Sequence, residues 1–343
     1  MDLIIIISDL ISSIANKFYL HTPTQIFGFP IFRYNTGMLL IHNTSQVIQL
    51  TPEPQRGAEL GTLNILPHGA VLIDGESILA VGEPAELLLA HPEADLLDAG
   101  GKAVLPGLVD PHTHLVWAGD RLDEFEMRLQ GKSYLEIMAA GGGIAATLQA
   151  TRAASFEELL TQTRERAHIA FAHGTTTLEA KTGYGLDIET ELRQLQVILK
   201  LDEEGPLELI PTYLGAHAIT PEFAGNAEGY TDFLCSEALP AVQAWWQKHA
   251  PARQLPFVDV FCEEGVFDLA QTRRILLRAQ ELGFPLKLHA DEFANLGGAS
   301  LAAELGAISA DHLVKTSAED IHKLTESNTV TVSLPGTPFG LAQ

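Results

Sequence analysis

The sequence has few cysteines, few basic residues and no long apolar run, and each shortage excludes a class of protein. Cys235 and Cys262 are the only cysteines among 343 residues, which excludes a disulfide-stabilised scaffold and fits a reducing compartment. Lys and Arg number 21 against 44 Asp and Glu, a formal net charge of −23. Such a chain repels nucleic-acid phosphates and anionic lipid surfaces, so we expect neither nucleic acid nor membrane as a partner.

No stretch of 18 apolar residues occurs, so the sequence predicts no membrane-spanning helix. The apolar run near its start covers only Leu3 to Ile7 and lacks the basic leader and small-residue cleavage site of a secretory signal. We therefore expect a cytoplasmic protein. A hydrophobic content of 46% in a chain of this length is enough for one large domain and one small one.

Three regions of the chain differ in pattern. Residues 1–37 mix an isoleucine run, aromatic residues and Pro/Gly turns without a clear period, and we treat them as an atypical N-terminal appendage. Residues 38–104 contain short apolar strands bounded by turn residues, which predicts a small β-sandwich module. Residues 105–343 alternate apolar strands with longer helical stretches, which indicates an α/β fold with a parallel sheet covered on both faces.

The third region predicts a TIM-like (β/α)8 barrel in which seven strands can be recognised. Polar residues gather at the C-terminal ends of these strands, the rim where barrel enzymes place their chemistry, and this favours a barrel over an open sheet. Capping-box spacing predicts helix starts at Ser155–Glu158, Asp268–Gln271 and Thr316–Glu319. The strands are expected at 104–114, 175–183, 208–218, 258–265, 285–292, 306–313 and 328–336.

Histidines at the strand ends suggest a metal site. His112 and His114 end the first strand two residues apart, so both imidazoles can face one metal ion. His289 ends a later strand and can supply a third nitrogen ligand, which suits Zn or Fe. A carboxylate beside an activated water can move its proton, which is the role expected of Glu292. His312 ends the next strand, where it can orient hydroxide or stabilise an oxyanion.

The run PGLVDPHTH, residues 106–114, resembles the opening metal motif of the amidohydrolase superfamily. Further segments are similar to the imidazolonepropionase family within it, in family order over about residues 39–343. The resemblance implies hydrolysis of the cyclic amide C–N bond of 4-imidazolone-5-propanoate to N-formimidoyl-L-glutamate, a step of histidine degradation, by metal-activated hydroxide. The segments are AHGTTTLEAKTGYGLDIETELR, PTYLGAHAITPEF, DVFCEEGVF, LKLHADEF and GAISADHL.

The resemblance also implies a role for individual residues. An Arg fork suits an anionic propionate on a chain this acidic. Lys181 is expected to be a polar residue of the rim rather than a carbamylated bridge between two metals, so we expect one Zn or Fe ion. The implied metal ligands are His112, His114 and His289, the catalytic pair is Glu292 and His312, and the substrate-binding residues are Arg121, Tyr134, Tyr184, His217 and Glu292.

One element of the family pattern is missing. The pattern calls for a metal-binding aspartate at the end of an eighth strand, in an Asp-x-Asn-Pro-Gly run that this sequence does not contain. We therefore expect a barrel truncated at its C-terminus, with unpaired edge strands. Two alternatives stay open: an aminohydrolase acting on a neutral nucleobase, which would not need Arg121, and an inactive truncated copy. The resembling enzymes are often homodimers, and the sequence does not decide the oligomeric state.

Overall fold

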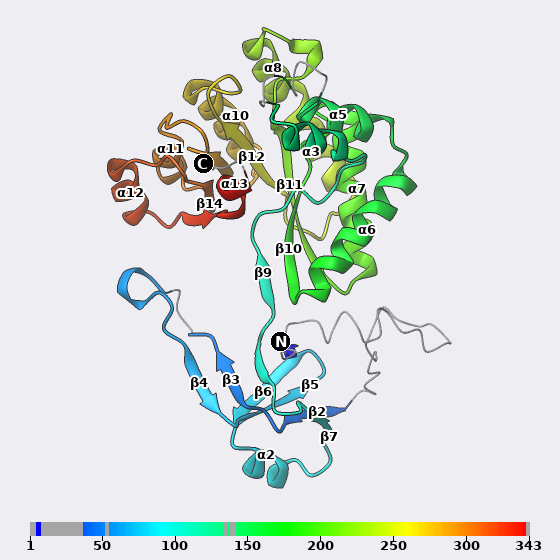
Figure 1. The fold of residues 1–343 in the computed structure, drawn as a ribbon, viewed down its shortest axis with the longest axis vertical. Helices are drawn as coiled ribbons and strands as arrows, with labels where there is room; N and C mark the ends of the chain where they lie inside the picture. The colour runs from blue at the N-terminus through cyan, green and yellow to red at the C-terminus, as the bar shows by residue number, and fades with distance from the viewer. Residues whose placement is uncertain (1–4, 8–36, 52–54, 133–135, 137–141, 341–343) are drawn as a thin grey trace. The chain divides into compact units, whose positions relative to one another are not determined.

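The computed structural model describes residues 5–7, 37–51, 55–132, 136 and 142–340 (Figure 1). The chain divides into two compact units. The smaller unit contains Met1–Asp110, His168–Thr177 and Asp202–Glu208, and the larger contains Pro111–Ala167, Leu178–Leu201 and Leu209–Gln343. Of the proposed appendage at 1–37, the description covers only residues 5–7 and 37. No helix in the described ranges is both long and apolar enough to cross a membrane.

The smaller unit is built from two four-stranded sheets that share an apolar core. Leu39, Ile41 and Ile73 come from one sheet, and Val47 and Val104 come from the other. Their alternation along the strands turns one face of each sheet inward, as in a sandwich. The sheet orders are β6(Ser77–Gly82)-β5(Ala70–Asp74)-β2(Met38–His42)-β7(Asp95–Asp98) and β1(Ile5–Ile7)-β8(Ala103–Pro106)-β3(Gln46–Gln49)-β4(Asn64–Pro67).

A seven-stranded sheet carries the strands predicted for the barrel, in sequence order. Each neighbouring pair from β11 to β15 is parallel, which confirms the expected α/β architecture. Seven strands are present among the described residues, and no eighth is among them. The strands are β9(Leu108–Asp110), β10(Thr175–Lys181), β11(Glu208–Ala216), β12(Phe257–Cys262), β13(Lys287–Ala290), β14(Ser309–His312) and β15(Val330–Ser333).

The first predicted strand, 104–114, is not one strand. Its beginning is β8, which pairs with β3, and β9 joins the seven-stranded sheet after a break at Gly107. Pro106 has no N–H to continue a ladder, and glycine weakens a strand interior, which accounts for the break. His112 and His114 consequently follow β9 in a loop rather than ending a long strand.

Helices lie between the strands, and two of the three predicted capping boxes are confirmed. Ser155 and Glu158 bond to each other at the start of α6, and Asp268 and Gln271 form the box of α10. The third box is wrong by one residue: Ser317 and Asp320 form it, because the Thr316 hydroxyl donates to Asp291 instead. The helices are α2(Pro84–Ala90), α3(Leu122–Leu129), α5(Ile144–Ala153), α6(Phe156–Ala172), α7(Ile188–Glu204), α8(Ala227–Phe233), α9(Leu239–His249), α10(Leu269–Glu281), α11(Gly298–Leu305), α12(Ala318–Thr325) and α13(Gly336–Gly340).

Removing the cap of α10 tests this local structure. The Asp268 carboxylate accepts from the Gln271 N–H at 2.8 Å, so Asp268→Ala leaves that donor without its partner. We expect the free energy of unfolding to fall by about 1 kcal/mol, measured by urea denaturation. The control is Glu264→Ala at an exposed position of the preceding loop, where the change should stay within about 0.5 kcal/mol. Equal effects of the two substitutions would contradict the cap.

Candidate functional site

Four histidines from three strand ends gather in the larger unit. The Nε2 atoms of His114 and His289 are 3.2 Å apart. The ring centroids of His112 and His289 are 4.5 Å apart, and the ring of His312 is 5.0 Å from each of them. One ligand nitrogen from each of His112, His114 and His289 lies within 4.8 Å of the others, a spacing that one metal ion can bridge. The three ligands predicted from the sequence are thus brought together.

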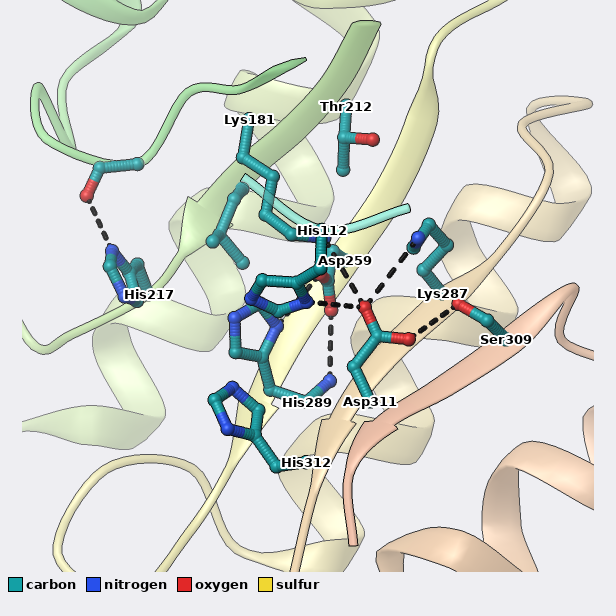
Figure 2. Close-up of polar contacts among 12 residues, drawn as sticks. His112, Lys181, Thr212, His217, Asp259, Lys287, His289, Ser309, Asp311 and His312 are labelled. Atoms are coloured by element: carbon teal, nitrogen blue, oxygen red, sulfur yellow. Dashed lines mark hydrogen bonds and ion pairs between the residues drawn. The ribbon is translucent and has the colours of Figure 1, made fainter. Parts of the chain in front are cut away.

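Two buried carboxylates fix the orientation of these rings. Nδ1 of His112 lies 2.7 Å from Oδ2 of Asp311, and Nδ1 of His289 lies 2.7 Å from Oδ2 of Asp259 (Figure 2). The backbone N–H of His289 also donates to Oδ1 of Asp259, at 3.0 Å. A carboxylate hydrogen-bonded to Nδ1 leaves Nε2 as the ligand atom and raises its basicity, and His112 has this arrangement. Nδ1 of His289 is close to Asp259 but makes no hydrogen bond, so Asp259 holds His289 through its backbone N–H.

Two of the histidines, His114 and His289, are held in the neutral form that binds metal. Burial lowers the pKa of His114 and of His289 well below the ordinary range, and their neighbouring imidazoles lower it further. Nδ1 of His114 is buried without a hydrogen-bond partner, and buried polar atoms of this kind require an explanation. Converging neutral imidazoles with carboxylates on two of them fit the donor set of a zinc or iron site.

The two aspartates beside the histidines belong to an ion network of two lysines and three carboxylates. Nζ of Lys181 lies 2.7 Å from Asp259, 2.8 Å from Glu179 and 3.5 Å from Asp311. Nζ of Lys287 lies 3.0 Å from Glu179 and 3.5 Å from Asp311. Glu179 and Asp311 could also join His112 around a metal, but Nζ of Lys181 and Nζ of Lys287 already contact Oε1 of Glu179 and Oδ2 of Asp311.

Lys181 is the last residue of β10, at the strand end where the sequence places it. Its side chain is completely buried. Although burial alone lowers the pKa of Lys181, Asp259 and Glu179 raise it above the ordinary range, so the lysine stays charged. Burial likewise raises the pKa of Asp311, but the hydrogen bond from His112 and the nearby lysines hold it below its usual range. Each charge of the network is therefore stabilised by the others.

Glu292 and His312, the predicted catalytic pair, lie together beside the histidine cluster. Oε1 of Glu292 is 3.5 Å from Nδ1 of His312, and neither nitrogen of His312 has a hydrogen-bond partner in the protein. Burial and the nearby Glu263 raise the pKa of Glu292 to about 7, and burial lowers that of His312 to about 4. A carboxyl group poised near neutral pH suits proton transfer in both directions. Asp291 is turned elsewhere and accepts from Thr316.

Two of the predicted substrate-binding residues, His217 and Tyr184, lie beside His114. The ring of His217 stacks on that of His114 with centroids 4.7 Å apart, and Tyr184 lies 5.2 Å from His217. Burial raises the pKa of Tyr184, while the charge of Arg121 lowers it, which places that guanidinium nearby. Nε of Arg121 donates to Thr147 at 3.0 Å. Tyr134 lies outside the described residues.

Sequence reasoning missed three members of the ion network: Glu179, Asp259 and Lys287. A signal existed for Asp259, which is a charged residue inside the otherwise apolar strand β12, while Glu179 and Lys287 share their strands with other polar residues. Charged residues are rarely buried unless they are paired. Glu179 and Lys181 are also two residues apart, as are Lys287 and His289, so strand alternation puts each pair on one face. The sequence does not show which charges meet across strands.

Comparison with known proteins gives the same family throughout. A family model described as "Imidazolonepropionase-like composite domain, bacteria" matches residues 69–94. The imidazolonepropionase of Herpetosiphon aurantiacus is 51% identical over 304 residues, which are 89% of this chain and 71% of that protein. The imidazolonepropionase of Chloroflexus aggregans is 48% identical over 87% of this chain and 70% of that protein.

Solved structures show the same fold at much lower identity. The 5-methylcytosine deaminase of Klebsiella pneumoniae matches with a TM-score of 0.56 and 16% identity, over 87% of this chain and 66% of that one. The ochratoxinase of A. niger matches with a TM-score of 0.53 and 14% identity, over 89% and 67%. These likenesses confirm the barrel-type architecture with its small β module.

The ion network predicts the effect of removing one of its cations. Lys181→Met leaves Asp259, Glu179 and Asp311 with Lys287 as their remaining lysine, so we expect a loss of about 3–5 kcal/mol in the free energy of unfolding. We also expect less metal per folded chain, measured by elemental analysis after gel filtration. Lys248→Met, at an exposed position of α9, is the control. A variant that keeps both stability and metal content would show that the network does not support the histidines.

Proposed function

Because the chain belongs to the imidazolonepropionase family, we propose that it hydrolyses the cyclic amide bond of 4-imidazolone-5-propanoate to N-formimidoyl-L-glutamate. Water adds to the ring carbonyl carbon, the C–N bond of the ring breaks, and the departing nitrogen gains a proton. The observation that carries the proposal is the convergence of three imidazoles beside Glu292, whose pKa is raised to about 7.

We propose His112, His114 and His289 as the ligands of one zinc or iron ion. A bound metal of this kind polarises a carbonyl and makes hydroxide available near neutral pH. Asp311 and Asp259 keep the Nδ1 side of two of these rings occupied, so the ligand nitrogens face the reaction. Three imidazoles suit both metals, and elemental analysis of the purified protein distinguishes them.

We propose that Glu292 carries the proton through the reaction. As a carboxylate it accepts the proton of the attacking water, and as a carboxylic acid it returns that proton to the departing ring nitrogen. Its burial makes both forms accessible near pH 7. His312, whose Nδ1 is 3.5 Å from this carboxylate and whose two nitrogens have no hydrogen-bond partner in the protein, would donate to the developing oxyanion.

We propose Arg121, Tyr184 and His217 as the groups that bind the substrate. An anionic propionate needs a local cation in this acidic chain, and the guanidinium of Arg121 is close enough to Tyr184 to influence its pKa. His217 donates from Nδ1 to the Gly183 carbonyl at 2.9 Å, so its Nε2 is an acceptor for the substrate. Burial lowers the pKa of His217 to about 4, which keeps the ring neutral. Tyr134 is a further proposed contact.

Two broader assignments accompany this function. We propose that residues 38–104 form the composite domain, because the family model matches 69–94 within them, and that 105–343 form the hydrolase barrel. We also propose a cytoplasmic location, because Cys235 and Cys262 are both unpaired, as is usual in a reducing compartment.

Turnover of freshly prepared 4-imidazolone-5-propanoate tests the proposed function. We expect loss of its ultraviolet absorbance with the purified chain, and a fall of about 10³-fold or more in kcat for Glu292→Gln. The matched control is Glu264→Gln, an exposed carboxylate in the loop after β12, whereas Glu292 lies in the loop after β13. Metal content is measured in all three proteins. Turnover of a neutral nucleobase in place of the imidazolone would favour the aminohydrolase alternative, and no turnover by metal-loaded protein would contradict the assignment.

The pKa of Glu292 predicts the acid side of the pH profile. The group acts first as a base, so it must be ionised, and the ionised fraction falls as the pH drops through about 7. We expect kcat/KM to fall about tenfold per pH unit below that value. Glu263→Gln removes the like charge that helps raise this pKa, so it should move the acid limb to lower pH. A profile that is flat between about pH 5 and 8 would contradict the assignment of Glu292 as the base.

A further inference from the structure

Glu191, in the first turn of α7, is a buried carboxylate that the proposed reaction does not use. Its side chain is 1% exposed. Oε1 accepts from the backbone N–H groups of Gly183, Gly185 and Leu186 at 3.1, 2.8 and 2.8 Å, and Oε2 lies 3.1 Å from the Gly183 nitrogen. One carboxylate thus accepts from three of the four N–H groups of the loop of residues 183–186.

The carbonyl groups of the same loop are also bound. Gly183 O accepts from Nδ1 of His217 at 2.9 Å, and Gly185 O accepts from Nε of Arg152 at 2.7 Å. The hydroxyl of Tyr230 lies 3.0 Å from Leu186 O. Hydrogen bonds thus hold both N–H groups and carbonyl groups of this loop. They fix its backbone conformation, and with it the direction of the side chain at position 184.

Close packing leaves the loop little freedom to find another conformation. Gly183 has a φ of +103°, and a Cβ there would lie 2.9 Å from Leu214 O. A Cβ on Gly185 would lie 2.6 Å from the Cβ of Thr190. Glycine is therefore required at both positions by the approach of β11 and α7.

The loop connects Glu191 to both side chains proposed to bind substrate on this side of the site. Tyr184 lies within the loop, and its ring is 5.2 Å from that of His217. His217 is fixed through the Gly183 carbonyl, while the N–H of that same Gly183 is bound by Glu191. Gly183 therefore links the Glu191 carboxylate to both side chains, because it binds His217 and directly precedes Tyr184.

We propose that Glu191 is a positioning residue for substrate binding, which fixes Tyr184 and His217 through the backbone of residues 183–186. The inference rests on the proposed function, in which these two side chains contact the substrate. Glu191 does not touch the reacting atoms. Its loss should therefore weaken substrate binding more than it slows the chemical step.

Glu191→Gln is the first test, because it keeps the size of the side chain and replaces one acceptor oxygen by a donor that faces bound N–H groups. We expect KM for 4-imidazolone-5-propanoate to rise about tenfold, with kcat changed less than about threefold and metal content unchanged. Hydrogen exchange of the peptide covering 183–186 should accelerate. Glu189→Gln, an exposed position on the same helix turn, should change neither quantity.

A second background separates positioning from general stability. In Tyr184→Phe the phenolic contact is already absent, so adding Glu191→Gln should raise KM by clearly less than it does in the wild type. Glu191→Asp keeps two acceptor oxygens on a shorter side chain, and should raise KM and exchange less than Glu191→Gln. This variant also serves if the Gln substitution prevents folding.

Unchanged exchange at 183–186 in both Glu191 variants would overturn the proposal, as would an equal rise in KM in the two backgrounds. A fall in kcat without a rise in KM would place Glu191 in the chemical step instead, and would also overturn it. The exchange measurement needs no substrate, so a wild-type chain that turns over nothing would contradict the proposed function while the exchange result still decides the role of Glu191.

Discussion

The attraction between two buried lysines and three buried carboxylates underlies the histidine site. Lys181 and Lys287 neutralise Glu179, Asp259 and Asp311, and two of these carboxylates in turn orient His112 and His289. An isolated carboxylate in the same interior would be strongly disfavoured and would take up a proton. The cations therefore keep the aspartates ionised, the ionised aspartates keep the Nδ1 sides occupied, and the ligand nitrogens remain on the side where substrate arrives. The network spans β10, β12, β13 and β14, so correct strand order is a condition for a correct site.

The two sides of the site are held by different kinds of interaction. Ion pairs fix the side with the proposed metal ligands, where the rings must keep one tautomer and one orientation. Backbone hydrogen bonds fix the side with Tyr184 and His217, where Glu191 binds a loop rather than a side chain. Both arrangements bury a charge, and in both the charge is stabilised by several donors or opposite charges rather than by one. Burial raises the pKa of Glu191 as well, but hydrogen bonds from Thr182 and from the loop backbone oppose the rise. At Glu292 burial and the like charge of Glu263 act in the same direction, and together they raise its pKa to about 7.

Much of this arrangement could be predicted from the sequence, because it is set by local periodicity and by strand ends. The seven strands, the capping boxes at Ser155 and Asp268, and the gathering of His112, His114, His289 and His312 all follow from patterns within short segments. The errors have a common physical origin. The break at Gly107 and the cap at Ser317 in place of Thr316 are each decided by partners from elsewhere in the chain. Periodicity describes one segment at a time, and it cannot show that the hydroxyl of Thr316 has a better acceptor in Asp291.

Lys181 shows why residue type alone misleads at such a site. A lysine at the end of a strand in this fold suggests either a polar residue of the rim or a group that bridges two metals. Neither interpretation predicts that its partners are buried carboxylates. The structure gives it three carboxylate neighbours within 3.5 Å and no exposure. Its charge thus stabilises the aspartates beside the histidines, and Lys181 itself has no proposed contact with metal or substrate. The same reasoning applies to Glu191, whose carboxylate accepts hydrogen bonds from backbone N–H groups. In this protein, buried charged residues with no proposed part in the reaction, such as Lys181 and Glu191, help to orient the side chains that are proposed to bind metal and substrate.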